Sequence, residues 1–115
     1  MVSRARYVPD RGDLIWLDFD PQAGHEQAGR RPALVLSPKN YHQRSGLAVV
    51  CPITSKIKGY PFEVLLEGLD KPSAVLADQM RSLDLGARQV KFIAKAAHET
   101  VAAVASLACA LIDPA

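Results

Sequence analysis

The chain of 115 residues has only two cysteines, and neither stands at metal-site spacing from another thiol or a histidine. Cys51 and Cys109 both have apolar neighbours, which predicts buried free thiols in a reducing compartment. The three histidines are scattered, so no zinc site is expected. His25-Glu26 begins like a zinc-protease motif, but Gly29 stands where the second histidine would be required.

Long apolar runs are absent as well. No stretch is long enough to span a bilayer, and the first residues lack the apolar core of a secretory signal. A phosphate-cradling P-loop and a dinucleotide fingerprint are also missing. These absences predict a cytoplasmic protein without membrane contact, metal or cofactor. A chain of this length is expected to form one domain, residues 1–115, around one core.

Positive charge is unevenly distributed, although the formal net charge is only +2. Segment 30–58 holds six basic residues and no acidic one, whereas acidic residues outnumber basic ones on both sides of it. Such asymmetry points to an anionic partner, of which nucleic acid is the commonest. A surface that is basic by chance remains the alternative at this point.

Short apolar runs between glycine and proline turns dominate the chain up to residue 95. They predict a polar turn over 38–46 and strands over 13–19, 32–37, 47–53, 62–66, 74–77 and 89–95, of which 74–77 leads into the segment 80–83. Strands at this spacing favour a small barrel or curled sheet. The alanine-rich segment 97–112 predicts a helix with an apolar stripe from Val101 to Ile112. We expect the sheet or a second copy of the chain to cover that stripe.

The stretch from His25 to Pro38 passes from a polar loop into an apolar run. Pro32 has no backbone N–H and suits the first residue of a strand, so Arg31 is expected at the entrance of a rigid element. A guanidinium held there can bind phosphate, because its planar fork matches the phosphate oxygens. Taken alone, however, the stretch fits better with Arg30 and Arg31 as solvated loop charges.

Further polar residues stand at predicted strand ends or in the loops that follow them: Glu26, Arg31, Thr54, Ser55, Lys56, Lys58, Asp78 and Gln79. These residue types suffice for one RNA-cleaving chemistry, in which the ribose 2′-OH attacks its own phosphodiester. A carboxylate can accept the proton, arginine can stabilise the developing charge, and a hydroxyl can position the phosphate. No metal is required in principle. Each residue on its own has a simpler interpretation, such as a turn hydroxyl for Thr54.

Five ordered runs, 12–16, 24–38, 51–54, 58–64 and 77–82, carry a family resemblance that extends over nearly the whole chain. The chain resembles the MazF/PemK toxins of bacterial type II toxin–antitoxin modules. The Lys-Gly-Tyr-Pro-Phe run places it nearer to the MazF branch than to the others. The resemblance implies a mainly β fold with helices (α+β): a small curled SH3-like β-barrel, as in CcdB and MazF, with a C-terminal α-helix.

The same resemblance implies a metal-independent, sequence-specific endoribonuclease that needs no cofactor. It would cleave single-stranded RNA, mainly mRNA, to 2′,3′-cyclic phosphate and 5′-hydroxyl ends, and so inhibit translation and growth. It would act as a homodimer, with RNA bound across the interface. Its other implied partner is a MazE-like antitoxin, whose disordered tail would occupy the RNA groove.

By position, the family's essential arginine and threonine fall on Arg31 and Thr54, and Glu26 matches an acidic position. We expect Arg31 to stabilise the charge on the phosphate, Thr54 to hold the phosphate and Glu26 to accept the proton. Arg30 stands where other members have histidine, so a fixed cation replaces a group that could titrate. The expected RNA-binding residues are Arg30, Asn40, Ser55, Lys56, Lys58 and Gln79.

Two other functions stay open on the sequence alone. A CcdB-like module of the same fold would poison gyrase by contact, without chemistry, and its toxicity would survive an Arg31→Ala substitution. A structural β-domain would be harmless when expressed. The Arg31-Pro32 and Pro52-Ile53-Thr54 runs resemble the nuclease branch and favour the ribonuclease.

Overall fold

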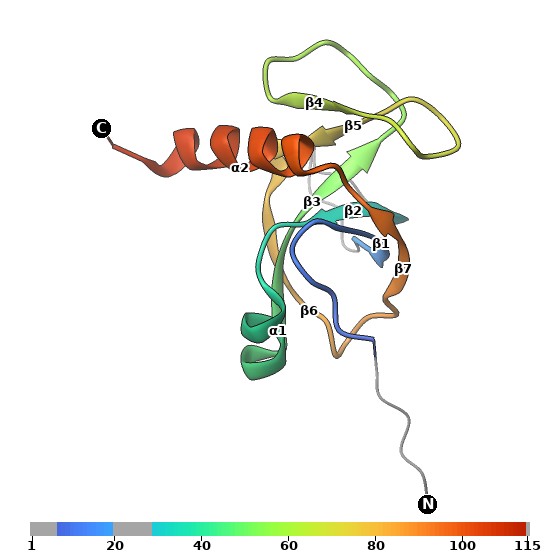
Figure 1. The fold of residues 1–115 in the computed structure, drawn as a ribbon, viewed down its shortest axis with the longest axis vertical. Coiled ribbons are helices and arrows are strands. Elements are labelled where there is room, and N and C mark those ends of the chain that lie inside the picture. Colours follow the sequence, from blue (N-terminus) through green and yellow to red (C-terminus); the bar gives the residue numbers. More distant parts are fainter. Residues whose placement is uncertain (1–6, 20–28, 115) are drawn as a thin grey trace, which may run out of the picture.

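The computed structural model describes residues 7–19 and 29–114. In these ranges every predicted strand is present, with ends shifted by at most two residues. The elements are β1 (Asp13–Asp18), β2 (Arg30–Val35), α1 (Lys39–Ser45), β3 (Leu47–Thr54), β4 (Glu63–Leu66), β5 (Ser73–Leu76), the 3₁₀ helix η1 (Ala77–Gln79), β6 (Arg81–Asp84), β7 (Lys91–Lys95) and α2 (His98–Ile112). Figure 1 shows their arrangement.

The strands form one curled antiparallel sheet in the order β4-β5-β3-β2-β1-β7, and β6 pairs with β3 beside this path. Strand β3 changes partner along its length. Its first half pairs with β6, from Leu47 to Val50, and its end pairs with β5 at Ile53 and Thr54. The short helix η1 connects β5 to β6 and so lies beside this change of partner. The mainly β fold with a C-terminal helix is therefore confirmed.

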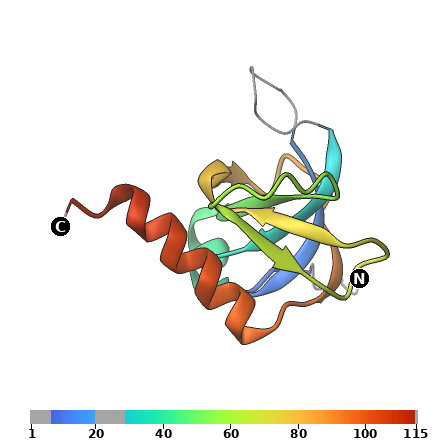
Figure 2. The ribbon, with the colours of Figure 1, turned by 90° about the horizontal axis from the view of Figure 1, so that it is seen from above.

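Both faces of the central strands are buried, which explains their continuous apolar sequence. On one face, Leu14, Leu34 and Ile53 pack in a cluster that includes Val104 of α2. On the other face, inside the curl, Ile15 and Leu17 pack with residues of β2, β3 and β6. Figure 2 shows α2 lying alongside the sheet, with its C-terminal end extending beyond it.

Helix α2 is only partly covered by its own chain. Val104 and Ala108 are buried, but Leu111 is exposed and Ile112 is 71% exposed. Cys109, expected to be buried, is also exposed, because it does not share the face on which Val104 and Ala108 lie. The sheet therefore covers the first part of the predicted stripe and leaves its end open. None of the helices in the described ranges has the length and apolar character needed to cross a membrane.

The predicted turn over 38–46 is wrong, because Lys39–Ser45 forms helix α1. One buried side chain anchors this otherwise polar helix: His42, which is 3% exposed. Its Nδ1 lies 2.7 Å from the carbonyl oxygen of Pro9 and therefore donates to it, while Nε2 lies 2.6 Å from Oγ of Ser37. These contacts bring the lead-in segment and the end of β2 against α1. A polar pattern of seven residues gives no sign of them.

Candidate active site

One cavity of about 650 Å³ brings together six of the nine predicted site residues. It opens between the end of β3, the loop that follows it and helix η1. A second cavity of about 460 Å³ adjoins it, and Arg31 and Ser55 line both. The six residues in the first cavity are Arg31, Thr54, Ser55, Lys56, Lys58 and Gln79.

Arg31 and Thr54 lie just beyond the point where the pairing of β2 and β3 ends, and both line the same cavity. The two strands pair as far as Ala33 and Pro52, and continuing that register by two residues sets Arg31 opposite Thr54. The pairing stops at Ala33, however, and Thr54 pairs with Ala74 of β5 instead. The strands therefore open a gap in the sheet, and both side chains line the cavity that forms there.

The sequence places Arg31 just before its strand. In the structure, Arg31 lies inside the strand. Strand β2 begins at Arg30, so Arg31 is its second residue and Pro32 its third. Because the pairing with β3 begins only at Ala33, the missing N–H of Pro32 removes no bond on that side. Arg31 is instead fixed by its pairing with Leu17 of β1. The backbone that carries this guanidinium is therefore more firmly held than a loop would be.

The hydroxyl of Thr54 is buried and directed by its own turn. The residue is 6% exposed, and its Oγ1 accepts a hydrogen bond from the backbone N–H of Lys56 at 3.1 Å. Within the described residues this hydroxyl donates no hydrogen bond, so its proton is available to an oxygen in the cavity. A guanidinium and a hydroxyl that enter one cavity from two strands can grip a phosphate between them.

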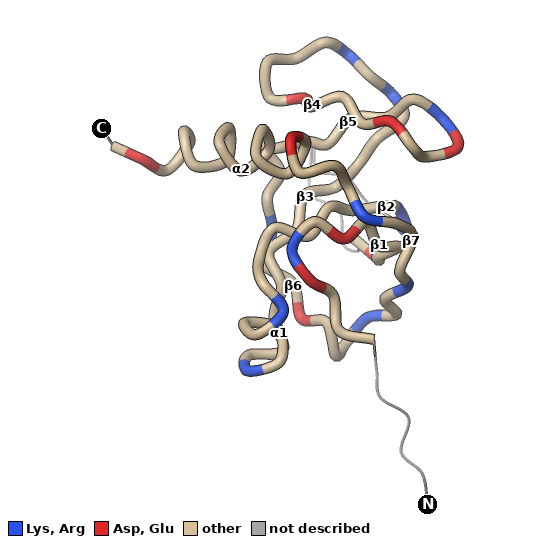
Figure 3. Tube along the Cα trace, viewed as in Figure 1, with Lys and Arg blue, Asp and Glu red and all other residues tan. Residues whose placement is uncertain are grey.

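The basic segment 30–58 divides in the fold. Lys39 and Arg44 belong to α1, which lies away from the loop between β3 and β4 (Figure 3). The other four basic residues line the two cavities: Arg30, Arg31, Lys56 and Lys58. Acidic residues line the cavities as well, namely Asp70 in the smaller one and Glu63 and Asp78 in the larger one, so basic residues outnumber acidic ones there without being alone.

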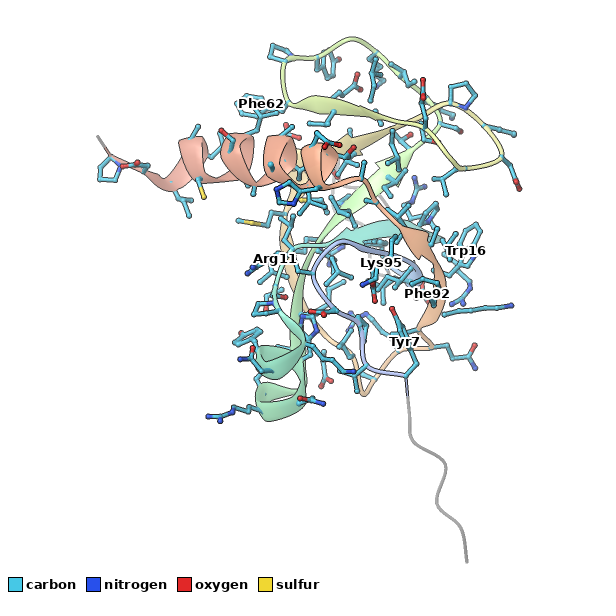
Figure 4. The ribbon with its side chains drawn as sticks, viewed as in Figure 1. Tyr7, Arg11, Trp16, Phe62, Phe92 and Lys95 are labelled. Atoms are coloured by element: carbon cyan, nitrogen blue, oxygen red, sulfur yellow. The ribbon has the colours of Figure 1, made fainter. Side chains whose placement is uncertain are left out.

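Arg30 belongs to the smaller cavity. Its Nη1 donates a hydrogen bond to the carbonyl of Gln89 at 3.2 Å, and the side chain is exposed. Trp16 of β1 lines the same cavity and is partly exposed (Figure 4). Arg30 and Arg31 therefore share the smaller cavity, and of the two only Arg31 also lines the larger one.

One predicted residue is not brought to these cavities, and another cannot be placed. Asn40 is exposed on α1 and lines neither of them. Glu26 lies outside the described residues, and so does any contact it makes with Arg31. Among the residues that the structure describes, no three His, Cys, Asp or Glu side chains gather in a way that could hold a metal ion.

Cys51 is not a nucleophile for this site. Burial, with a smaller contribution from the charge of Asp78, raises the pKa of the Cys51 thiol to about 12. The thiol therefore stays protonated near neutral pH, and it packs in the core below the site. The reading of Cys51 as a core residue is consistent with this position.

Sequence reasoning missed the residues that shape the rim of the larger cavity, which are Tyr60, Phe62 and Glu63. Phe62 is labelled in Figure 4, at the end of the loop that leads into β4. A signal for them was present, because a basic and an aromatic residue flank Gly59 in the Lys58–Tyr60 run. Basic and aromatic residues in one loop are typical of surfaces that bind single-stranded nucleic acid.

A family model described as the PemK-like, MazF-like toxin of type II toxin–antitoxin systems matches residues 10–112. This chain belongs to that family. A relative with an assigned activity is the endoribonuclease toxin MazF of Escherichia coli K12, 56% identical over 88 residues. That match covers 76% of this chain and 78% of the relative.

Solved structures of MazF proteins have the same fold. A crystal structure of MazF from Deinococcus radiodurans superposes with a TM-score of 0.88 at 52% identity, covering 93% of this chain and 98% of that one. A MazE–MazF crystal structure from the same organism gives a TM-score of 0.82 at 44% identity, covering 96% of this chain and 100% of that one. The curled sheet and α2 are therefore the MazF arrangement.

Proposed function

We propose that this MazF-family protein is the toxin of a type II toxin–antitoxin module and acts as an endoribonuclease on single-stranded RNA, mainly mRNA. One observation carries the proposal: Arg31 and Thr54 line one cavity, beyond the point where β2 and β3 stop pairing, and Lys56 and Lys58 also line it. The E. coli relative, named an endoribonuclease toxin, supports the same activity. Because mRNA is the target, the protein would work in the cytoplasm.

The cavity residues supply what transesterification of RNA requires. The 2′-oxygen forms a bond to phosphorus and the bond from phosphorus to the 5′-oxygen breaks, which leaves a 2′,3′-cyclic phosphate and a 5′-hydroxyl. Arg31 donates hydrogen bonds to the phosphate oxygens as their negative charge grows, and Thr54 donates one more. Arginine stays protonated and is a poor base. Glu26 is therefore proposed to accept the 2′-OH proton, while Arg31 donates a hydrogen bond to the leaving 5′-oxygen, which takes up its proton from solvent water.

Substrate binding is assigned to the rims of the two cavities. These rims carry polar groups from a strand end, a loop and helix η1, namely Arg30, Ser55, Lys56, Lys58 and Gln79. Polar groups outside long regular elements are suited to recognition of unstacked bases. Asn40 is retained as an RNA-binding residue only through the resemblance, because α1 lines neither cavity. The gyrase-poisoning alternative has no support from the named relatives above.

We predict that the purified protein cuts a long single-stranded RNA in the presence of EDTA. A single 2′-deoxy nucleotide at the cut site should abolish cleavage there, because the attacking oxygen is missing. The 5′-hydroxyl ends of the products can be sequenced after digestion to give the recognised bases. Cleavage that persists at the deoxy site would rule out this mechanism, and loss of all cleavage in EDTA would rule out metal independence.

Two protein partners complete the proposal. The Deinococcus MazF is seen with MazE, and we propose a MazE-like antitoxin for this chain that covers the two cavities. A second copy of the chain would cover the open end of α2. A groove of about 930 Å³ runs along that helix, with Met80, Val101, Ala105 and Cys109 among its walls. An apolar groove beside an exposed apolar helix end is the surface that a homodimer would bury.

We predict that Ala105→Glu converts a dimer to a monomer, because it places a charge in that groove. Light scattering after size exclusion should give twice the 12.5 kDa chain mass for the unmodified protein and the single mass for the variant. Ser106→Glu is the matched control, since Ser106 is exposed on the same helix and does not line the groove. A monomeric unmodified protein would contradict the prediction.

A further inference from the structure

The loop between β3 and β4 is fastened at its end by Glu63, whose backbone N–H donates to the carbonyl oxygen of Tyr60 at 3.0 Å and whose carboxylate accepts from the loop. Oε1 of Glu63 accepts hydrogen bonds from three successive backbone N–H groups, at 3.1 Å from Lys58, 2.7 Å from Gly59 and 3.2 Å from Tyr60. Oε2 lies 3.2 Å from the same Lys58 nitrogen. Gly59 has a φ of +79°, which turns the three N–H groups toward one point. Such a concave row of N–H groups is a nest that favours an anion.

The anion in this nest is itself anchored to the floor of the larger cavity. Glu63 pairs with Leu76 at the end of β5, and the carbonyl of the preceding Phe62 accepts a hydrogen bond from Ala77 at 3.0 Å. Helix η1, which carries Gln79, begins at Ala77. The loop is therefore held in a defined position relative to the cavity and not merely closed on itself.

The fastened loop displays an aromatic ring next to a cation. Tyr60 is 60% exposed, and the ammonium of Lys58 lies 5.8 Å from its ring centroid. Both residues line the cavity that holds Arg31 and Thr54. An exposed ring beside a positive charge is the arrangement on which an unpaired base stacks while its phosphate is neutralised.

Charge alone does not explain a carboxylate at this place. Glu63 lies in the cavity proposed to receive a polyanion, where a negative charge weakens binding. Water could satisfy the three loop N–H groups equally well if the loop were free to move. The carboxylate instead selects one loop conformation. We therefore assign it a role in fixing the shape of the loop.

We propose that Glu63 is a positioning residue for RNA recognition. It holds the 58–60 backbone so that the Tyr60 ring stacks on one unpaired base of the substrate, next to the scissile phosphate bound by Arg31 and Thr54. This inference rests on the proposed ribonuclease function and adds a determinant of base recognition. Glu63 acts through Tyr60 and Lys58, and does not itself contact the RNA.

The test compares kcat and KM on an RNA oligonucleotide that contains the cut site. Glu63→Ala should raise KM about tenfold and leave kcat within twofold, because base–aromatic stacking is of that order. Glu67→Ala is the matched control: it removes the same charge from an exposed position beyond β4 and should leave KM unchanged or lower it. Glu63→Gln keeps one acceptor oxygen, so its KM should lie between those of the unmodified protein and Glu63→Ala. A graded KM of this kind distinguishes loss of positioning from misfolding.

Coupling to Tyr60 decides the mechanism. Tyr60→Ala should raise KM as much as Glu63→Ala, and the double variant should be no worse than either single one, because both remove the same stacking interaction. Replacing one base at a time by an abasic nucleotide should reveal one position that matters to the unmodified protein and no longer matters to either variant. Additive effects, or a Glu63→Ala variant that behaves like Glu67→Ala, would overturn the inference. An unmodified protein that cuts no RNA would overturn the proposed function as well.

Discussion

Replacing Arg31 with alanine is expected to lower kcat for RNA cleavage by about a thousandfold, the scale seen when an enzyme loses a main donor to a developing oxyanion. The physical reason is that Arg31 brings a fixed charge and a planar fork to the point where β2 and β3 separate. Single-turnover cleavage of a short RNA, at protein concentrations above KM, measures this directly. Arg31→Lys should recover only part of the rate, because an ammonium keeps the charge and loses the bidentate geometry.

Substitutions of two other arginines serve as comparisons for this prediction. Arg44→Ala is the control, because Arg44 is exposed on α1 and lines neither cavity, so cleavage should be unaffected. Arg30→Ala should raise KM by severalfold and reduce the salt dependence of binding, since Arg30 is a cation assigned to substrate binding. If Arg31→Ala keeps more than a tenth of kcat, the assignment of Arg31 as the charge-stabilising residue is wrong.

The strands could be predicted from sequence because their buried residues form short, continuous apolar runs. Leu14 faces one core cluster, and Ile15 and Leu17 face the other, so β1 is apolar throughout and bounded by turn residues. Helix α1 could not be predicted in this way. Its stability depends on His42 reaching Pro9, a contact that spans 33 positions of the chain and leaves no periodic signal. A local sequence pattern indicates which neighbouring residues are buried together. It does not indicate a single contact between residues far apart in the chain.

The sequence indicates which residues belong to the candidate site, but not how the strands bring them together. The family resemblance indicates Arg31 and Thr54, but only the end of the β2–β3 pairing explains why they meet. The position of Pro32 in its strand was predicted wrongly. A proline is tolerated inside a strand where no partner strand needs its N–H, and the sequence does not show where the partner strand ends. Glu63 escaped attention for a similar reason: its contacts require the positive φ of Gly59, and they appear only once the loop is folded.

Asp13 is a buried charge that links β1 to β7, and its neighbours determine how the fold responds to acid. The residue is 3% exposed. Its Oδ2 accepts hydrogen bonds from the Tyr7 hydroxyl at 2.5 Å and from the Asp10 N–H at 3.0 Å, and its Oδ1 lies 2.5 Å from Nζ of Lys95. Tyr7 also packs edge-on against Phe92, with ring centroids 5.7 Å apart. Figure 4 shows Tyr7, Phe92 and Lys95 on the same side of the sheet.

The pKa shifts in this cluster give the sign of the pH dependence. Burial would raise the pKa of Asp13, but the hydrogen bonds from Lys95 and Tyr7 outweigh it and hold that pKa below its usual value. Its stabilising contribution is therefore complete above the unfolded-state value near pH 4 and is lost as the pH falls through the folded-state pKa. The hydrogen bond to Asp13 raises the pKa of Lys95, and burial raises that of Tyr7. Those two contributions are complete below about pH 10 and are lost as the pH rises further.

Asp13→Asn is accordingly expected to lower the free energy of unfolding by about 2 kcal/mol at pH 7, because charge-assisted hydrogen bonds become neutral ones in a buried site. The loss should shrink toward pH 3, because there the carboxyl group of Asp13 takes up a proton in the unfolded chain and the stabilisation by its charge declines. Urea unfolding at the two pH values measures both effects. Asp70→Asn, at an exposed position, should change the free energy of unfolding by less than about 0.5 kcal/mol at either pH. An Asp13→Asn variant with the same loss at pH 3 as at pH 7 would show that the charge of Asp13 is not what stabilises the junction of β1 and β7.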